Sequence, residues 1–238
     1  MSAAVKTLAV VQHTSAEYLG LMEDHFEGRR IRFRYFRPFT AGGKLPQPGQ
    51  IADGLVLLGG GPWGAAPGAH RLPTLDAEVA LTAGALAAAS PVIGIGLGAI
   101  IVALAAGGGA APQPLIFEVT AARRLEEGAL AGYLPERYPL VRYGRDAAIL
   151  PREARVLARD AGERPALFQF GERAFGFAGH PGVKSAMVED LIMEFAEAPA
   201  EPEPGLRALR AEQEAIETAL VPIMTGLVRC TGLMDERA

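Results

Sequence analysis

The sequence predicts an α/β protein with a mostly parallel central sheet flanked by helices. Short continuous apolar runs, typical of buried parallel strands, occur at Thr7–Val11, Gly54–Leu58 and Pro91–Ile95. Segments with helical periodicity separate these runs, as the crossover connections between parallel strands require. The chain has 238 residues, of which 50% are hydrophobic, so it can bury a sizeable core in one large or two small domains.

The first crossover is predicted to be a helix that follows the strand at Thr7–Val11. Thr14 or Ser15 is expected to cap it, and Glu17 would lie in its first turn, where an acidic side chain interacts well with the helix dipole. Its apolar face would comprise Leu19, Met22 and Phe26.

The following elements alternate in the same way. Ile31–Phe36 alternates apolar residues with arginine and is expected near a sheet edge, and the Gly- and Pro-rich stretch Pro38–Gln50 is expected to be a loop. The remaining elements of the first half are helices at Thr74–Ala89 and Gly98–Ala106 and a strand at Pro114–Val119.

The second half changes character, because short apolar runs separated by turn signals predict antiparallel strands added to the same domain. These runs are Leu140–Tyr143, Ala154–Ala158, Ala166–Phe170 and Ala174–Ala178. A helix is expected at Lys184–Glu197, and a Pro- and Glu-rich linker at Ala198–Gly205 leads to a helix at Arg207–Leu227. We therefore expect a domain over residues 1–198, followed by a linker and C-terminal helix over 199–238. The apolar stripe of that helix must be buried on its own core or on a partner.

Composition excludes several classes of protein. The formal net charge of −4 argues against a nucleic-acid partner, which would require clustered positive charge. The single cysteine, Cys230, excludes a disulfide framework and indicates a reducing, cytoplasmic location. Met1–Val11 lacks the apolar length of a secretory signal, and Pro91 with nearby glycines interrupts the uncharged stretch between Glu78 and Glu118, so no membrane span is expected. The four histidines show no ligand spacing, and neither a metal nor a cofactor is expected.

Three glycine-rich or histidine-containing segments follow predicted strands. Gly59–Gly64 and Gly94–Gly98 lie at the carboxyl ends of two parallel strands, and His180-Pro181 follows a third strand. Ligands of open parallel sheets bind beyond these ends, so the three segments are expected to face one crevice.

Together these segments resemble the class I glutamine amidotransferase family, especially stand-alone members related to the amidotransferase domain of GMP synthase. The resemblance covers Lys6 to Phe195 and implies a flavodoxin-like fold. It is carried by Thr7–Thr14, Asp53–Gly60, Pro91–Ala99 and Gly176–Gly182. The family uses a Cys nucleophile at the strand-to-helix elbow, a His base and a Glu that orients the base.

The resemblance implies a degenerate triad. The Cys position is Gly96, the Glu position is Gly182, and of the triad only His180 remains. A family Gln has become Ile100, and the two residues before the base are Ala178 and Gly179. Since Gly96 cannot form a glutamyl thioester, no glutaminase activity is expected.

Backbone features of the family site are independent of these substitutions. The amides of Gly60, Gly61 and Leu97 would form the family's oxyanion hole and are expected to persist as an anion- or carboxylate-binding nest. Arg142 and Tyr143 lie in Arg142–Arg145, where relatives carry Trp-His-Gly-Asp, so the pocket would be more electropositive. With Ile100, these residues are the candidate ligand-binding set. The alternative for the arginines is a solvated surface pair.

Three further alternatives remain open at this point. Gly94-x-Gly96-x-x-Ala99, with Glu118 at a later strand end, also matches a dinucleotide fingerprint, or the glycines merely permit a tight turn. His180 is either a structural residue or the centre of altered hydrolytic chemistry. Trp63 is a packed loop anchor, a lid residue or a partner contact.

The sequence thus indicates an amidotransferase-like protein without glutaminase activity, acting as a binding, scaffold or regulatory subunit of a biosynthetic enzyme. Its expected partner is a synthase-type protein or a second copy, through the C-terminal helix. The alternative is an enzyme with altered chemistry in the crevice around His180.

Overall fold

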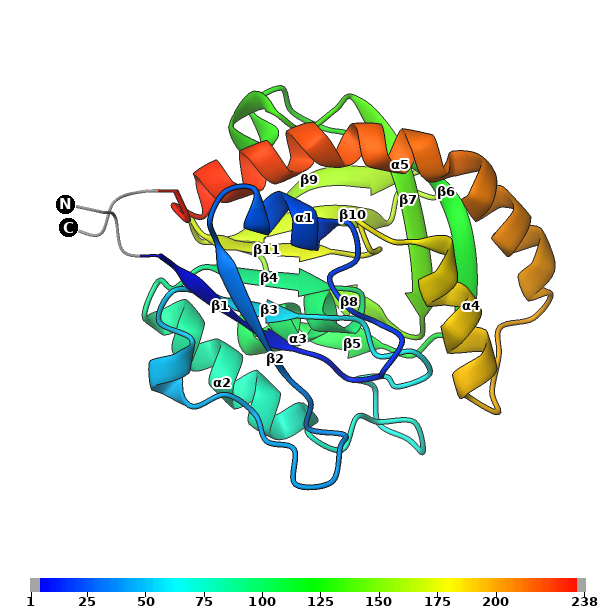
Figure 1. Cartoon of the computed structure of the whole chain (residues 1–238), viewed down its shortest axis with the longest axis horizontal. Helices are drawn as coiled ribbons and strands as arrows, with labels where there is room; N and C mark the ends of the chain where they lie inside the picture. Colours follow the sequence, from blue (N-terminus) through cyan, green and yellow to red (C-terminus); the bar gives the residue numbers. More distant parts are fainter. Residues whose placement is uncertain (1–4, 235–238) are drawn as a thin grey trace.

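A computed structural model of the chain describes residues 5–234. Its centre is a nine-stranded sheet with the order β2-β1-β3-β4-β11-β10-β9-β6-β7 (Figure 1). Five neighbouring strands are parallel: β2 (Arg32–Phe36), β1 (Thr7–Val11), β3 (Leu55–Leu57), β4 (Val92–Ile95) and β11 (Ala174–Phe177). The mostly apolar, continuous strands β1, β3 and β4 occupy the interior of this parallel part, and the arginine-rich β2 forms its edge. The predicted α/β class is confirmed.

An antiparallel extension continues the sheet beyond β11. It consists of β10 (Pro165–Phe170), β9 (Arg155–Asp160), β6 (Ile116–Arg124) and β7 (Arg137–Gly144). A separate ribbon pairs β5 (Gly109–Ala111) with β8 (Ala147–Ile149). The prediction that the strand at Ala174–Ala178 belongs to an antiparallel set is wrong on one side, since β11 is antiparallel to β10 but parallel to β4. This pairing brings the residues that follow β11 to the same edge as the end of β4.

Helices cover both faces of the sheet. One face carries α2 (Leu75–Ala87) and α3 (Leu97–Ala105), and the other carries α1 (Met22–Glu27), α4 (Ser185–Glu194) and α5 (Pro202–Cys230) (Figure 1). Short 3₁₀ turns, η1 (Pro48–Gln50) and η2 (Ala129–Gly132), lie in the connections. Alternate residues of β1 enter different cores, Leu8 and Val10 on the α5 side and Ala9 and Val11 on the α2–α3 side. No helix within residues 5–234 is long and apolar enough to cross a membrane.

The first helix begins later than the sequence predicts. Neither Thr14 nor Ser15 caps it, because the chain from Gln12 to Gly20 is irregular and α1 starts at Met22.

The C-terminal helix is longer than expected and buries its own stripe. It starts at Pro202, within the expected linker, because proline is well tolerated in the first helical turn. Its apolar side chains belong to the chain's cores and are at most 3% exposed: Leu209, Ile216, Leu220, Ile223, Met224 and Leu227. The stripe therefore packs on α1, α4, η2, β6 and β7, and of the two predicted alternatives it is the chain's own core that buries it. A partner would contact the opposite face of α5.

Candidate functional site

The turn between β4 and α3 has the geometry of an exposed elbow. Gly96 has φ 56° and ψ −115° and caps α3, and its N–H donates to Phe177 O at 2.8 Å. A Cβ at Gly94 would clash with the carbonyl oxygen of Gly98, and one at Gly98 would clash with that of Leu57. The corresponding atom at Gly96 would meet only Gly59 Cα, at 3.5 Å. Close packing therefore requires Gly94 and Gly98, whereas the space beside Gly96 is free for a side chain.

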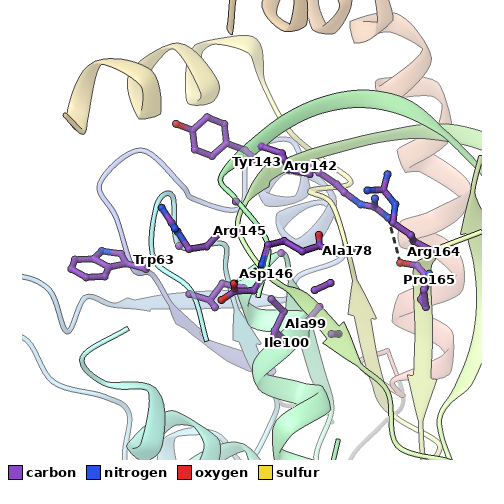
Figure 2. Close-up of a pocket in the computed structure, with 18 of the residues that line it drawn as sticks. Trp63, Ala99, Ile100, Arg142, Tyr143, Arg145, Asp146, Arg164, Pro165 and Ala178 are labelled. Atoms are coloured by element: carbon purple, nitrogen blue, oxygen red, sulfur yellow. Dashed lines mark hydrogen bonds between the residues drawn. The ribbon is translucent and has the colours of Figure 1, made fainter. Parts of the chain in front are cut away.

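Most of the candidate ligand-binding residues gather around this elbow. Gly60, Leu97, Ile100, Arg142 and Tyr143 line, together with Gly96, an open hollow of about 680 Å³, here called the elbow cavity. Figure 2 shows Ala99 and Ile100 at its floor, Arg142 and Arg164 on one side, and Trp63 and Arg145 on the other. Gly61 does not line it. His180 lies beside a second, smaller cavity that shares Gly96 and Tyr143 with the first.

Of the three amides of the predicted nest, one binds a side chain of the protein and two belong to residues that line the elbow cavity. Gly61 N–H donates to Glu17 Oε2 at 2.5 Å. Within residues 5–234, the N–H groups of Gly60 and Leu97 have no acceptor, and both residues line the elbow cavity. An incoming oxygen atom could therefore use two of the three expected amides.

Glu17 also belongs to this site, and its predicted place in the first turn of a helix is wrong. Its side chain does not lie in a first helical turn but is buried, with 5% exposure, against the Gly59–Gly61 loop. Burial raises the pKa of this carboxyl to about 7, against the opposing effects of the Gly61 N–H and His13. The spacing of residues along the chain could not show this, since the segment that carries Glu17 is irregular.

A buried ion pair, His13 with Glu78, contacts the Gly59–Gly61 loop. His13 Nε2 lies 2.8 Å from Glu78 Oε2, and its Nδ1 donates to Gly59 O at 2.9 Å. Thr74 Oγ1 donates to the other oxygen of Glu78 at 2.6 Å. Burial opposes the charged ring, but the Glu78 carboxylate outweighs this effect, and the pKa of His13 is raised. The pair links β1, the loop and α2.

His180 is held as a neutral, fully engaged ring. Nε2–H donates to Tyr18 O at 2.8 Å, and Nδ1 accepts from Gly182 N–H at 3.1 Å. Burial lowers the pKa of His180 to about 4, so the imidazole is uncharged at neutral pH. A Cβ at Gly182 would lie 2.9 Å from Met22 Cγ and 3.0 Å from Met22 N, which leaves no room for a glutamate without movement of α1.

The arginines near the elbow cavity are paired within the protein. Arg142 Nη1 lies 2.7 Å from Asp160 Oδ2 and 3.5 Å from Glu118 Oε2, and Arg164 contacts the same two acids at 2.7 Å each. Arg145 Nη2 lies 2.6 Å from each carboxylate oxygen of Glu197. The expected electropositive character is thus largely balanced. Glu118 is likewise engaged, on an antiparallel strand, and the dinucleotide alternative has no support from its position.

Comparisons with known proteins find similarity to one synthase in sequence and to glutamine amidotransferases in fold. No family model matches the chain. It is 32% identical over 166 residues to the glutamine-hydrolysing GMP synthase of Aeropyrum pernix, an alignment covering 67% of this chain and 31% of that protein. A glutamine amidotransferase structure from Methylobacillus flagellatus superposes with a TM-score of 0.80 at 21% identity, covering 95% of this chain and 96% of that one. A glutamine amidotransferase structure from Thermotoga maritima gives 0.77 at 23% identity, covering 96% and 99%. The chain is thus similar in sequence to a glutamine-hydrolysing synthase and shares the fold of glutamine amidotransferase structures. It spans about a third of the length of the synthase that it matches.

The departures of this chain from the class I glutamine amidotransferase pattern that it resembles fall at one place. The elbow has kept its backbone, while Gly96 and Gly182 occupy the positions where the family resemblance has Cys and Glu. Ile100, at the family's Gln position, is 5% exposed and contributes an apolar side chain to the cavity floor. Trp63 is half-buried at the rim and packs against the α2–α3 core, in keeping with a loop anchor.

Proposed function

We propose that this amidotransferase-like protein has no glutaminase activity and acts as a binding or regulatory subunit of a biosynthetic enzyme. The observation that carries the proposal is Gly96: the elbow is formed, and the space for a nucleophile is present, but no side chain occupies it. Loss of the nucleophile from such a triad lowers the rate by about a million-fold.

Two further features support the absence of glutaminase activity independently of Gly96. A general base needs a free lone pair near its substrate, yet Nδ1 of His180 accepts a hydrogen bond from Gly182 N–H and Nε2–H is donated to Tyr18 O. The position that would orient the base is Gly182, which is packed against Met22.

The proposed partner is a synthase-type protein. The family resemblance implies that amidotransferase domains deliver ammonia to a synthase across an interface, and the 32% identical relative is itself a synthase. A copy without the reaction can retain such an interface. A second copy of this chain is the alternative partner, and the outer face of α5 is the surface of that helix that remains for either.

Glutaminase activity is tested by measuring ammonia release from glutamine by the wild type and by Gly96→Cys, with Gly96→Ala as the matched control for backbone strain. The Cys side chain fits sterically, but we expect no release above background from any of the three, because His180 and Gly182 are unchanged. Hydrolysis by Gly96→Cys would show that the nucleophile alone is missing; hydrolysis by the wild type would refute the proposal.

The binding role is tested by native co-purification of the tagged full chain, followed by reconstitution from purified components. We expect a biosynthetic enzyme at fixed stoichiometry that binds again when purified. Recovery of the chain alone, as a homo-oligomer or a monomer, would refute the synthase partner.

The second candidate function is altered, non-glutaminase chemistry in the same crevice. It is favoured by one observation, the pair of amides of Gly60 and Leu97 that have no acceptor within residues 5–234 and lie beside an open cavity, because such amides stabilise a developing oxyanion. Ester hydrolysis by the wild type that is lost when the cavity floor is filled by Ala99→Leu would support it.

A further inference from the structure

The smaller cavity beside His180, here called the inner cavity, has an unusual lining. Its walls are mainly apolar side chains of β7 and α4, including Val141, Val188 and Leu191. The lining residues that carry polar side chains are Glu17, Tyr143 and His180. The cavity admits only a guest close to the size of a water molecule.

Glu17 carries the charge of this cavity without a basic partner. Among the residues that the structure describes, no Lys or Arg forms an ion pair with it, and its carboxylate accepts a hydrogen bond from Gly61 N–H. His13 lowers the pKa of Glu17, but its ring is hydrogen-bonded to Glu78 and to Gly59 O. Burial of an ionised carboxylate is costly unless it is paired, so the site favours an added positive charge.

Tyr143 supplies a second unused acceptor. Its hydroxyl is buried and, across residues 5–234, has no hydrogen-bond partner. Burial, with smaller contributions from the negative charges of Glu17 and Glu197, raises the pKa of Tyr143 to about 12. His180 adds no charge, because its ring is neutral and both of its nitrogens are engaged.

We propose that the inner cavity binds a small ammonium-type cation, with Glu17 as its counter-ion and the Tyr143 hydroxyl as a second hydrogen-bond acceptor. This site is distinct from the elbow cavity, and the inference does not depend on whether the protein hydrolyses glutamine.

The lining distinguishes an ammonium-type ion from a metal ion. Ca²⁺ needs six to eight oxygen ligands, and no group of three or more acidic, His or Cys side chains suited to a metal occurs within the described part of the chain. An ammonium ion instead donates a few N–H hydrogen bonds to oxygen atoms and tolerates apolar or aromatic walls. The carboxylate and phenol satisfy that requirement.

The charged groups around the inner cavity also favour a cation over an anion. Glu194 of α4 lies close enough to raise the pKa of Glu17, and His13 acts in the opposite direction. His13 is balanced by Glu78, and Glu197 is balanced by Arg145. The remaining acids, Glu17 and Glu194, make the surroundings negative.

The test is thermal unfolding of the full chain at about pH 8, where Glu17 is mostly ionised, in ammonium, methylammonium, potassium or sodium chloride at constant ionic strength. We expect ammonium to raise Tm saturably, by about 3 to 6 °C at ten times its Kd, with sodium inactive. Glu17→Gln should abolish the response, and Tyr143→Phe should weaken binding about tenfold. Glu194→Gln is the matched control and should retain the ammonium-specific rise.

Two outcomes would overturn the proposal: equal effects of all four salts, or an undiminished ammonium response in Glu17→Gln. Because a buried substitution can impair folding, a second measurement uses ¹⁵N-ammonium, whose proton signal in the wild type should show a slowly exchanging, bound species. Tyr143→Phe, which changes no charge, should reduce that signal. Its absence from the folded wild type would equally refute the site.

Discussion

The clearest quantitative prediction concerns the ion-pair network at Arg142. Arg142 and Asp160 are both buried, with side chains 10% and 1% exposed, and are joined at 2.7 Å. Asp160 has other donors as well: Arg164 Nε at 2.7 Å and the N–H groups of Gly162 and Arg164 at 2.9 Å. Arg142, in contrast, has only the longer contact to Glu118 as a second ion pair within residues 5–234, at 3.5 Å.

This asymmetry predicts unequal effects of two substitutions. Arg142→Met leaves Asp160 paired with Arg164 and should lower the free energy of unfolding by about 1.5 to 3 kcal/mol, the contribution of a charged hydrogen bond. Asp160→Asn leaves two guanidinium groups facing each other with Glu118 alone, and should cost about 3 to 5 kcal/mol, as expected when one member of a buried ion pair is removed.

The assay is urea unfolding at pH 7, followed by the fluorescence of Trp63, the single tryptophan, and by circular dichroism. Burial opposes ionisation of Asp160, but the Arg164 N–H, Arg142 and Arg164 outweigh it, and the pKa of Asp160 is lowered from 3.8. An acid with a lowered pKa stabilises the fold above its unfolded-state pKa and loses this contribution as pH falls through the folded-state value. The difference between the wild type and Asp160→Asn should therefore shrink below about pH 4.

Equal costs for the two substitutions, or a larger cost for Arg142→Met, would refute the reasoning. A stable Arg142→Met variant also tests whether Arg142 binds a ligand in the elbow cavity or only pairs with acids of the protein. If its charge is committed to Asp160, ligand binding in the elbow cavity should depend little on it beyond packing.

Two other predictions concern the supports of the site and the C-terminal helix. Glu78→Gln removes the partner of buried His13; since the pKa of His13 is raised from 6.5, the pair's contribution is full below that pH and is lost as pH rises through the folded-state pKa. Unfolding titrations should show the wild-type advantage over Glu78→Gln declining above about pH 6.5, and a constant difference would contradict the assignment. On α5, Met224→Ala at a fully buried position should cost about 2 to 5 kcal/mol, whereas Val221→Ala, 53% exposed, should change stability by less than about 0.5 kcal/mol. Similar costs in urea unfolding would mean that the stripe is not packed on its own core.

Much of the parallel half could be predicted because its signals are local. Apolar runs such as Val92–Ile95 form strands wherever both faces are buried, and the glycines at 94 and 98 are needed at the turn for contacts with neighbouring backbone. The position of β11 was less predictable, because its parallel pairing with β4 joins segments about eighty residues apart. Local sequence does not specify which strand will be the hydrogen-bonding neighbour of a given segment in the sheet.

The candidate site shows the same division. The sequence alone determined that position 96 provides no nucleophilic side chain, because glycine has no side chain in any fold. It also indicated that the segments Gly59–Gly64 and Gly94–Gly98 face one crevice, because carboxyl ends of parallel strands share an edge. Ile100 and Tyr143 were assigned to the same crevice by the family resemblance.

Only the tertiary structure decided what occupies that crevice. It placed Glu17 on the Gly61 amide, engaged both ring nitrogens of His180, and balanced Arg142 with Asp160. These contacts join residues far apart in the chain, and hydrogen bonding and desolvation depend on three-dimensional neighbours rather than on spacing. The sequence therefore determined that position 96 carries no side chain, while the fold determined the charges and cavities around it.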